Sequence, residues 1–234
     1  MQVRHSAMAF AGGALVFPGG KIEDQDSDTE LNDLIDHARG DDELRPAKVA
    51  AIRETFEECG LLLASRPGDP RPINGLQASQ LAQDRQLLNR GDLQFIDILR
   101  KDSLRLDCGS LVHFAHWVTP DFMPRRFDTH FFLAHAPESQ REAHDGEESV
   151  DSVWFRAEDA IDAAAEGRYK MLFPTRSILH RLRGDTPPSE HLREAAGTPV
   201  VTVAPQLVER ETGTFVQIPD NIGYVHFEEQ VSKD

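Results

Sequence analysis

Three acidic residues with helical spacing form the most informative pattern of this chain. Glu54, Glu57 and Glu58 lie in residues 53–60, which read as the end of a helix that stops at Gly60. With about 3.6 residues per turn, the three side chains share one face of that helix. Carboxylates this close repel one another, and the repulsion raises at least one carboxyl pKa, unless a cation or a basic partner lies among them. The spacing therefore predicts a site for a hard divalent cation with oxygen ligands.

The opposite flank of the same helix is apolar. Val49, Ile52, Phe56 and Cys59 recur at helical spacing and lie on the side turned away from the carboxylates. Pro46 suits a first helical turn, so the helix is expected to begin close to it. Such a helix can bury one flank and present its acids on the other.

A glycine turn upstream distinguishes this pattern from the acidic helix faces that are common on protein surfaces. Glu-rich helix faces are common, and two adjacent acids alone would favour a solvated surface. Residues 16–23, however, form an apolar run broken by Pro18, Gly19 and Gly20, and glycines allow the backbone to approach a ligand closely. A chance match at five fixed positions arises about once in a million starting points if each residue type is used at several per cent. These positions are Arg53, Glu54, Glu57, Glu58 and Gly60.

Together these residues resemble the signature of the Nudix hydrolases. That signature, the Nudix box, is a glycine, five residues, an acid, seven residues, and then the Arg-Glu, Glu-Glu and Gly pattern of residues 53–60. Counted from Gly20, the acid is Asp26, where the family usually has Glu. An insertion over residues 27–45 splits the box, which here spans residues 20–61.

The resemblance extends beyond the box. Residues 51–60 and 126–132 are similar to the Nudix branch that includes peroxisomal coenzyme A diphosphatases and their bacterial relatives. Thr55 departs from the apolar residue that the family usually has at its position, although Phe56 beside it can supply the packing.

The resemblance also implies the roles of the site residues. Glu54, Glu57 and Glu58, with the carbonyl of Gly19, are expected to hold Mg²⁺ or Mn²⁺. Arg53 is expected to orient a neighbouring carboxylate through a charge-assisted hydrogen bond. Glu54 is alternatively the general base, a role that shifts among relatives. The implied reaction is the metal-dependent hydrolysis of a diphosphate linkage.

Three interpretations of the function stay open. The resemblance favours coenzyme A or acyl-coenzyme A, and a nucleotide sugar or a nicotinamide dinucleotide is the alternative. A third reading is a catalytically silent domain that binds nucleotides as a sensor. The complete set of helix acids speaks against silence, whereas Asp26 and the split box keep it open.

The fold implied by the resemblance is α/β: a Nudix-type α/β/α sandwich with a mixed β-sheet and inserted helices, as a single domain over residues 1–234. Composition agrees, because 39% apolar and 28% charged residues in a chain of 234 are ordinary for a globular protein. The family also carries a strand upstream of the position of Met1, so the reading frame is expected to extend upstream. Arg4 and the apolar run after it resemble a signal peptide, but cleavage would cut into the glycine turn, so export is not expected.

A net charge of −15 argues against partners that need a basic field, namely nucleic acids and membrane surfaces. The expected partner is a small-molecule diphosphate, which must be held by local positive charge. Arg125 and Arg126 are candidate phosphate contacts, with ordinary turn charges as the alternative. Cys59 and Cys108 are expected to be reduced thiols in a cytoplasmic protein. The sequence does not fix the oligomeric state, and a homodimer is an open alternative.

Periodicity and turn residues predict the remaining elements. A short amphipathic helix is expected from Ser27 to Gly40. A helical insertion over about residues 77–102 reads as a packing cover over the sheet or as a lid that shapes substrate choice. Further expected elements are strands at 111–118, 128–136 and 150–156, helices at 157–167 and 174–183, and strands at 200–203 and 214–218 in a C-terminal extension over about residues 186–234.

Two other sets of side chains could bind a metal. His113 and His116 lie three residues apart on an expected strand, which would point them to opposite faces and favours an ordinary structural role. The resemblance implies a further metal-binding acid after the strand expected at 128–136. Glu147 and Glu148 are the candidates, and the alternative is that they are acids of a solvated loop.

Overall fold

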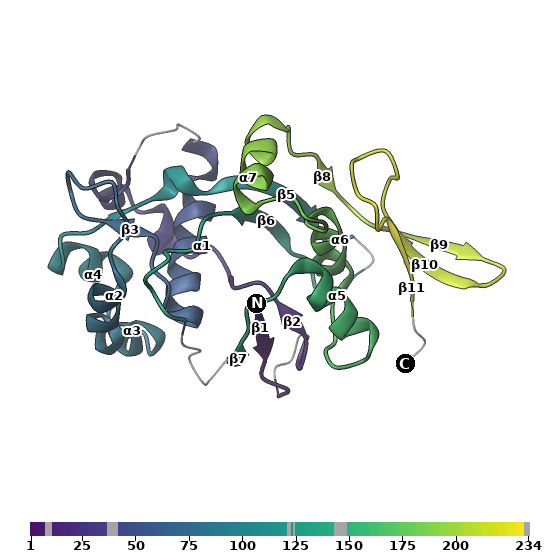
Figure 1. Cartoon of the computed structure of the whole chain (residues 1–234), viewed down its shortest axis with the longest axis horizontal. Helices are drawn as coiled ribbons and strands as arrows, with labels where there is room; N and C mark the ends of the chain where they lie inside the picture. Colours follow the sequence, from purple (N-terminus) through teal and green to yellow (C-terminus); the bar gives the residue numbers. More distant parts are fainter. Residues whose placement is uncertain (8–10, 37–41, 121–122, 124, 143–148, 232–234) are drawn as a thin grey trace.

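The computed structural model describes residues 1–7, 11–36, 42–120, 123, 125–142 and 149–231. A sheet crosses the middle of the molecule, with helices on both of its sides (Figure 1). Its order is β6-β5-β8, formed by β5 (Val112–Val118), β6 (Asp128–Leu133) and β8 (Thr202–Val203). Strand β5 pairs antiparallel with β6 and parallel with β8, so the sheet is mixed as predicted.

The remaining strands of the described residues form three further sheets. One has the order β2-β1-β7, from Leu15–Val16, Gln2–Arg4 and Ser149–Ser152. A second has the order β11-β10-β9, from Glu228–Gln230, Gly213–Gln217 and Gln206–Arg210. The third pairs β3 (Ala64–Ser65) with β4 (Arg105–Leu106).

Seven α-helices occur among the described residues. They are α1 (Arg45–Cys59), α2 (Gly75–Gln80), α3 (Ala82–Asn89), α4 (Phe95–Lys101), α5 (Ala157–Ala165), α6 (Phe173–Arg181) and α7 (Pro188–Gly197). Short 3₁₀ helices lie at Asp24–Ser27, Thr29–Leu34, Asp42–Leu44 and Cys108–Ser110.

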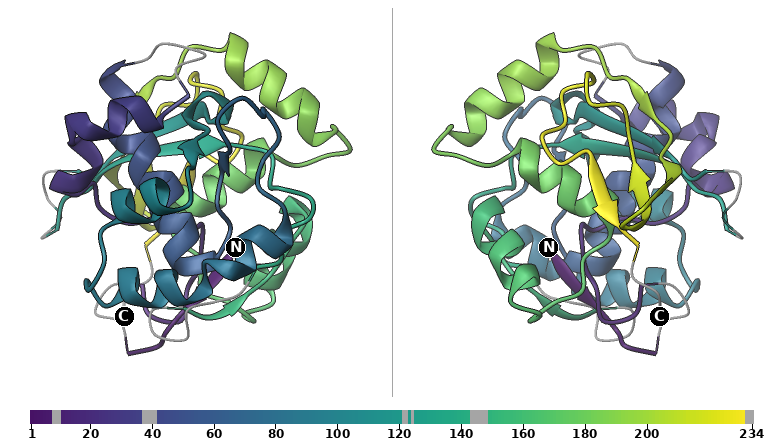
Figure 2. Two further views of the ribbon diagram at one scale, coloured as in Figure 1. Left: turned by 90° about the vertical axis from the view of Figure 1, so that its left-hand side faces the viewer. Right: turned by 90° about the vertical axis from the view of Figure 1, so that its right-hand side faces the viewer.

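The two faces of the sheet pack against different helices. Phe132 of β6 packs into an apolar core with α1, whereas its neighbours Phe131 and Leu133 pack into a core with α6 and α7. Successive side chains of a strand point to opposite faces, so one short stretch of β6 serves both cores. Figure 2 shows α1 and the inserted helices at one end of the molecule and the C-terminal sheet at the other. The α/β/α arrangement predicted from the sequence is confirmed.

Helix α1 follows the predicted pattern. Pro46 lies in its first turn, and Gly60 ends it in the left-handed conformation with φ 72°. Val49, Ile52 and Phe56 are buried on the apolar flank. The flank packs against residues of the helical insertion such as Phe95, Ile98 and Leu99, and the cluster extends to β3 and β4. The insertion therefore packs against α1, and its two interpretations, a packing cover over the sheet and a lid, stay predictions.

The helix predicted between Ser27 and Gly40 is wrong for the described residues. Two short 3₁₀ helices take its place, and the Asp28 side chain accepts a hydrogen bond from the Glu30 amide at their junction. The chain then becomes extended at Ile35, and the Asp36 amide donates to the Leu106 carbonyl of β4 at 2.9 Å. This backbone bond keeps the segment alongside β4, where a helix could not remain. Residues 37–41 lie outside the described part of the chain.

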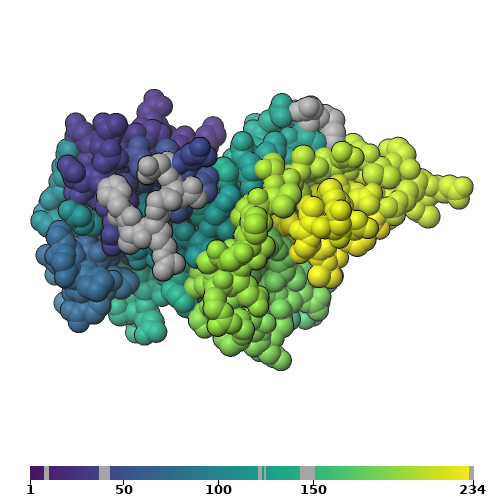
Figure 3. Space-filling model, turned by 90° about the horizontal axis from the view of Figure 1, so that it is seen from above, coloured from purple at the N-terminus to yellow at the C-terminus, as the bar shows by residue number. Residues whose placement is uncertain are grey.

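The C-terminal extension packs against β5. Val203 and Ile218 are buried in the core that contains Trp117 of β5, and the Trp117 indole donates to the Tyr224 hydroxyl at 3.0 Å. The strands expected at 200–203 and 214–218 correspond to β8 and β10, whereas α7, β9 and β11 were not predicted. Figure 3 shows the β9–β10 hairpin as a projection from the molecule.

Both cysteines are free and buried. Burial raises the pKa of the Cys108 thiol to about 12, and burial also raises that of Cys59. Among the described residues, no helix is long and apolar enough to cross a membrane.

Candidate active site

Arg53 lies at the centre of the acidic cluster and is 1% exposed. Its Nε and Nη2 atoms donate to the two carboxylate oxygens of Asp26, at 2.9 and 3.0 Å. Its Nη1 donates to Glu54 Oε1 at 2.8 Å and to Glu57 Oε1 at 3.1 Å, and Nη2 also donates to the Lys21 carbonyl at 2.9 Å. One buried guanidinium therefore joins two acids of α1 to the loop that follows the glycine turn, through planar charge-assisted hydrogen bonds.

The glycine turn lies against the same helix. The Gly19 amide donates to Glu58 Oε2 at 2.8 Å. A Cβ atom on Gly20 would overlap the carboxyl group of Glu54, so only glycine leaves room for that side chain. The turn thus lies against α1, in contact with Glu54 and Glu58. The structure shows a contact of the Gly19 amide. A contact between the Gly19 carbonyl and a metal ion stays a prediction.

Asp26 has a function that sequence reasoning did not assign. It is fully buried, and the Glu23 amide donates to Asp26 Oδ2 at 2.8 Å. The box spacing from Gly20 marks Asp26 as an acid of interest, but its partner lies 27 residues away, beyond the insertion. The structure shows that Asp26 is the principal ion-pair partner of Arg53.

Charge and burial shape the protonation of the cluster. Burial raises the pKa of Glu57, and the charges of Glu23 and Asp26 add to this, while Arg53 opposes it. Burial alone would lower the pKa of Arg53, yet its hydrogen bond with Asp26 and the neighbouring carboxylates raise it. Arg53 therefore stays charged and offers one positive charge to several carboxylates.

The donor set fits a hard divalent cation. Asp26, Glu54 and Glu57 all accept hydrogen bonds from one guanidinium, so Arg53 alone cannot balance them when all three are ionised. Carboxylate oxygens are the ligands that Mg²⁺ and Mn²⁺ prefer. The side chains of Glu54 and Glu57 are 14% and 20% exposed, so both can be reached from solvent.

A Gly20→Ala substitution is expected to lower turnover by about 10-fold or more while the protein stays folded. The new methyl group would displace the end of the flexible Glu54 side chain and weaken its 2.8 Å contact with Arg53. Steady-state kinetics and urea unfolding of the variant test this. Gly197→Ala is the control, because a methyl group added at Gly197 would have no other group within 4 Å to displace. Equal turnover in both variants would contradict the prediction.

The inserted helix α3 supports the last turn of α1. Arg85 Nε and Asn89 Nδ2 donate to the Glu57 carbonyl at 2.9 and 3.2 Å. A carbonyl in the last turn of a helix has no partner within the helix, and these side chains supply one. The insertion thereby holds the backbone from which Glu57 projects.

An Arg85→Met substitution keeps the apolar stem and is expected to lower the free energy of unfolding by about 1 kcal/mol, since Asn89 still bonds the carbonyl. The urea midpoint measures this loss. Arg90→Met is the matched control at an exposed position of the same helix end. A loss of the same size in the control would rule out the Glu57 carbonyl as the cause.

Four further site residues were predicted from the sequence. Arg125 and Arg126 are exposed where the chain enters β6, and their contact with a phosphate stays a prediction. Glu147 and Glu148 lie outside the described residues.

The predicted divergence of His113 and His116 is wrong. His113 pairs with Phe132 and Ala115 with Phe131, so two steps along β5 match one step along β6. This β-bulge at Phe114 shifts the alternation by one residue and turns both histidines to the same face. On that face, the rings of His113 and His116 both lie next to His130 of β6. The pKa of His130 is lowered by burial and by the charge of His116.

Comparisons with known proteins agree with the fold and the box. A family model described as the NUDT19 Nudix domain matches residues 40–176. The acyl-coenzyme A diphosphatase NUDT19 of Gallus gallus is 26% identical over 203 residues, which cover 68% of this chain and 54% of that protein. Its namesake from Homo sapiens is 30% identical over 145 residues, covering 57% of this chain and 39% of that protein.

A solved structure is similar over most of the chain. The crystal structure of a NUDIX hydrolase from Alicyclobacillus acidocaldarius aligns with a TM-score of 0.64 and 25% identity, covering 86% of this chain and 87% of that one. By contrast, this chain spans about half the length of the curated relatives it matches, 54% for two of them and 52% for a third.

A mixed sheet between helices, with an acid-bearing helix held against a glycine turn, defines a domain of the Nudix hydrolase class. Within that class, the chain belongs to the NUDT19 Nudix domain family. The family predicted from the box is confirmed. The matched region begins after the glycine turn, so the contacts of Gly19 and Asp26 supply the part of the box that the match does not cover.

Proposed function

We propose that this protein is a metal-dependent Nudix diphosphohydrolase that cleaves the diphosphate linkage of coenzyme A or acyl-coenzyme A. The observation that carries the proposal is the pair Glu54 and Glu57, joined by Arg53, together with Glu58, which accepts a hydrogen bond from the Gly19 amide. The names of the Gallus gallus and Homo sapiens relatives, both acyl-coenzyme A diphosphatases, favour this substrate class.

In this proposal, Glu54, Glu57 and Glu58 would hold Mg²⁺ or Mn²⁺, with the Gly19 carbonyl as a further ligand. When bound, such an ion neutralises charge on the diphosphate and lowers the pKa of a bound water. Hydrolysis of coenzyme A would give 3′,5′-adenosine diphosphate and 4′-phosphopantetheine.

The protein groups then orient the reaction. Arg53 fixes Glu54 and Glu57 through hydrogen bonds of 2.8 and 3.1 Å, and the Gly19 amide fixes Glu58. In the alternative, Glu54 would be the general base instead of a metal ligand, since its carboxylate lies between Arg53 and the Gly20 turn while staying partly exposed to solvent. Arg125 and Arg126, both exposed at the entry to β6, are the proposed phosphate contacts.

A substrate screen tests the proposal. Coenzyme A, acetyl-coenzyme A, a uridine diphosphate sugar and nicotinamide adenine dinucleotide are incubated with the protein and Mg²⁺ or Mn²⁺, and products are separated by liquid chromatography. Turnover of the coenzyme A compounds supports the proposal. Turnover restricted to the sugar or dinucleotide would favour the alternative substrates, and binding without turnover would favour a nucleotide sensor. A cytoplasmic location and a homodimer stay predictions.

A further inference from the structure

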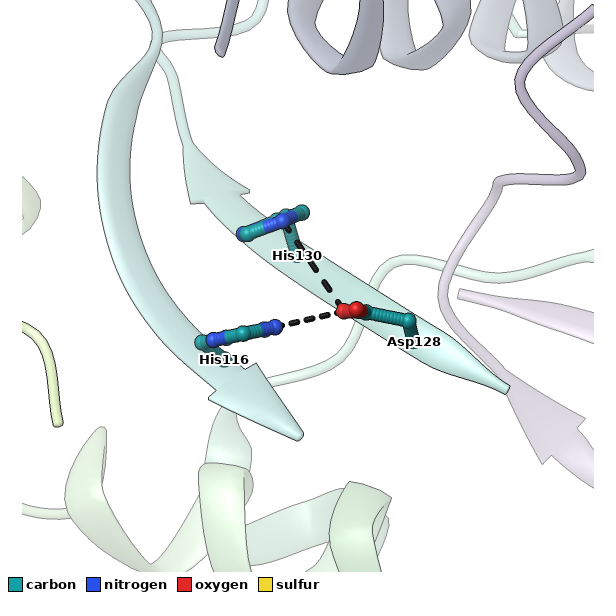
Figure 4. Close-up of side chains that lie close together, drawn as sticks. All are labelled: His116, Asp128 and His130. Atoms are coloured by element: carbon teal, nitrogen blue, oxygen red, sulfur yellow. Dashed lines mark hydrogen bonds and ion pairs between the residues drawn. The ribbon is translucent and has the colours of Figure 1, made fainter. Parts of the chain in front are cut away.

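Three potential metal ligands meet on the central sheet, and none of them is a residue of the box. His116 lies on β5, and His130 and Asp128 lie on β6. Candidate ligand atoms of the three residues all lie within 4.8 Å of one another. Figure 4 shows both imidazole rings beside the Asp128 carboxylate. His116 Nε2 is 2.5 Å from Asp128 Oδ1, and His130 Nε2 is 3.9 Å from the same oxygen.

The strand pairing explains why these side chains meet. His116 lies directly opposite His130 in the antiparallel register, and their rings stack with centroids 4.1 Å apart. Asp128 precedes His130 by two residues and therefore lies on the same face of β6. Phe132, two residues further along, packs into the core with α1, so the cluster lies on the face of the sheet that α1 covers.

Both histidines are oriented through their second ring nitrogen. His116 Nδ1 lies 2.8 Å from Thr202 Oγ1 of β8, and His130 Nδ1 lies 3.1 Å from His113 Nε2. In metal sites, a hydrogen bond at one ring nitrogen commonly fixes the tautomer and the ring orientation, which leaves the other nitrogen for the ion. Here the other nitrogen of each ring is the one closer to the carboxylate.

The donor set differs from that of the box. Two imidazoles and one carboxylate suit a borderline ion such as Zn²⁺, whereas Mg²⁺ prefers oxygen ligands alone. Zinc bonds of about 2.0–2.2 Å place tetrahedral ligand atoms roughly 3.3–3.6 Å apart. Asp128 is 68% exposed, so its side chain has room to turn into that geometry.

We propose that His116, Asp128 and His130 form a Zn²⁺ site that is separate from the carboxylate cluster of the box. Such a site would join β5 to β6, with Thr202 and His113 as positioning residues. Its three protein ligands leave a fourth position for water or another small ligand, as in open zinc sites. The proposal stands independently of the hydrolase activity, because neither the ligands nor the test requires turnover.

Isothermal titration of Zn²⁺ into the tag-free 234-residue chain, with Mg²⁺ in large excess to occupy the box, tests the site. The expected result is one Zn²⁺ per chain and a rise in melting temperature. His130→Gln and Asp128→Asn each remove a ligand and are expected to weaken Zn²⁺ binding by about 100-fold or more. Thr202→Val leaves all three ligands in place and is expected to weaken binding by about 10-fold. Asp128→Asn changes an exposed side chain, so it tests the site even if His130→Gln fails to fold.

His135→Gln is the matched control, because His135 is exposed and follows β6 along the chain. It is expected to bind Zn²⁺ like the unmodified protein. The proposal is overturned if the unmodified protein binds no Zn²⁺ under excess Mg²⁺. It is equally overturned if Zn²⁺ binding is unchanged in Asp128→Asn, which would place the ion elsewhere.

Discussion

Replacing Glu58 by glutamine is expected to lower turnover of the diphosphate substrate by about 10²-fold or more. The amide oxygen of glutamine can still accept the hydrogen bond that the Gly19 amide donates to Glu58 at 2.8 Å. The fold and the glycine turn should therefore persist, while the negative charge that would bind the divalent ion is lost. Steady-state kinetics over a range of Mg²⁺ concentrations measure both the fall in kcat and the rise in the Mg²⁺ concentration needed for half-maximal rate.

Glu43→Gln provides the control for this experiment. Glu43 is exposed in the 3₁₀ helix Asp42–Leu44 immediately before α1, so its substitution removes the same charge without touching the cluster. Turnover close to that of the unmodified protein is expected for the control. Unchanged magnesium-dependent turnover in Glu58→Gln would remove Glu58 from the proposed ligand set, even if the protein proves to be a hydrolase.

The part of the site that lies on one helix was predictable from sequence. Local spacing sets which residues of a helix share a face, and a glycine after the last apolar residue marks its end. Glu54, Glu57 and Glu58 could therefore be grouped without a structure, and Gly60 could be identified as the cap. The glycine turn was also found, because its residue types restrict the backbone locally.

Features that depend on pairing between distant segments were not predictable in the same way. The bulge at Phe114 reverses the faces of half of β5, yet it arises from the register with β6 and leaves no mark in the local alternation. The extended segment at Ile35 similarly depends on backbone bonding to β4. Helix α7 did carry a usable signal, since Pro188 lies at its first turn.

An Asp26→Asn substitution is expected to lower the free energy of unfolding by about 3 kcal/mol, at the lower end of the effect of breaking a buried ion pair. Asp26 and Arg53 have side chains that are 0% and 1% exposed, so solvent cannot replace the lost charge. Asparagine keeps one oxygen acceptor for the guanidinium but not the bidentate carboxylate. Arg53 also keeps its contacts with Glu54 and Glu57, which is why a larger loss is not expected. The midpoint and slope of urea unfolding measure the change.

The same substitution separates the two functions of Arg53. If Asp26 anchors the guanidinium and the guanidinium orients Glu54 and Glu57, the folded Asp26→Asn protein should also lose turnover, and more Mg²⁺ should restore only part of it. Asp24→Asn is the control in the same 3₁₀ helix, where the side chain is exposed, and its stability should change by less than about 0.5 kcal/mol. A destabilised Asp26→Asn protein with full turnover would show that the ion pair stabilises the fold but does not contribute to turnover. Equal stability in both variants would instead show that the buried pair contributes nothing to folding, because its desolvation would then cancel its attraction.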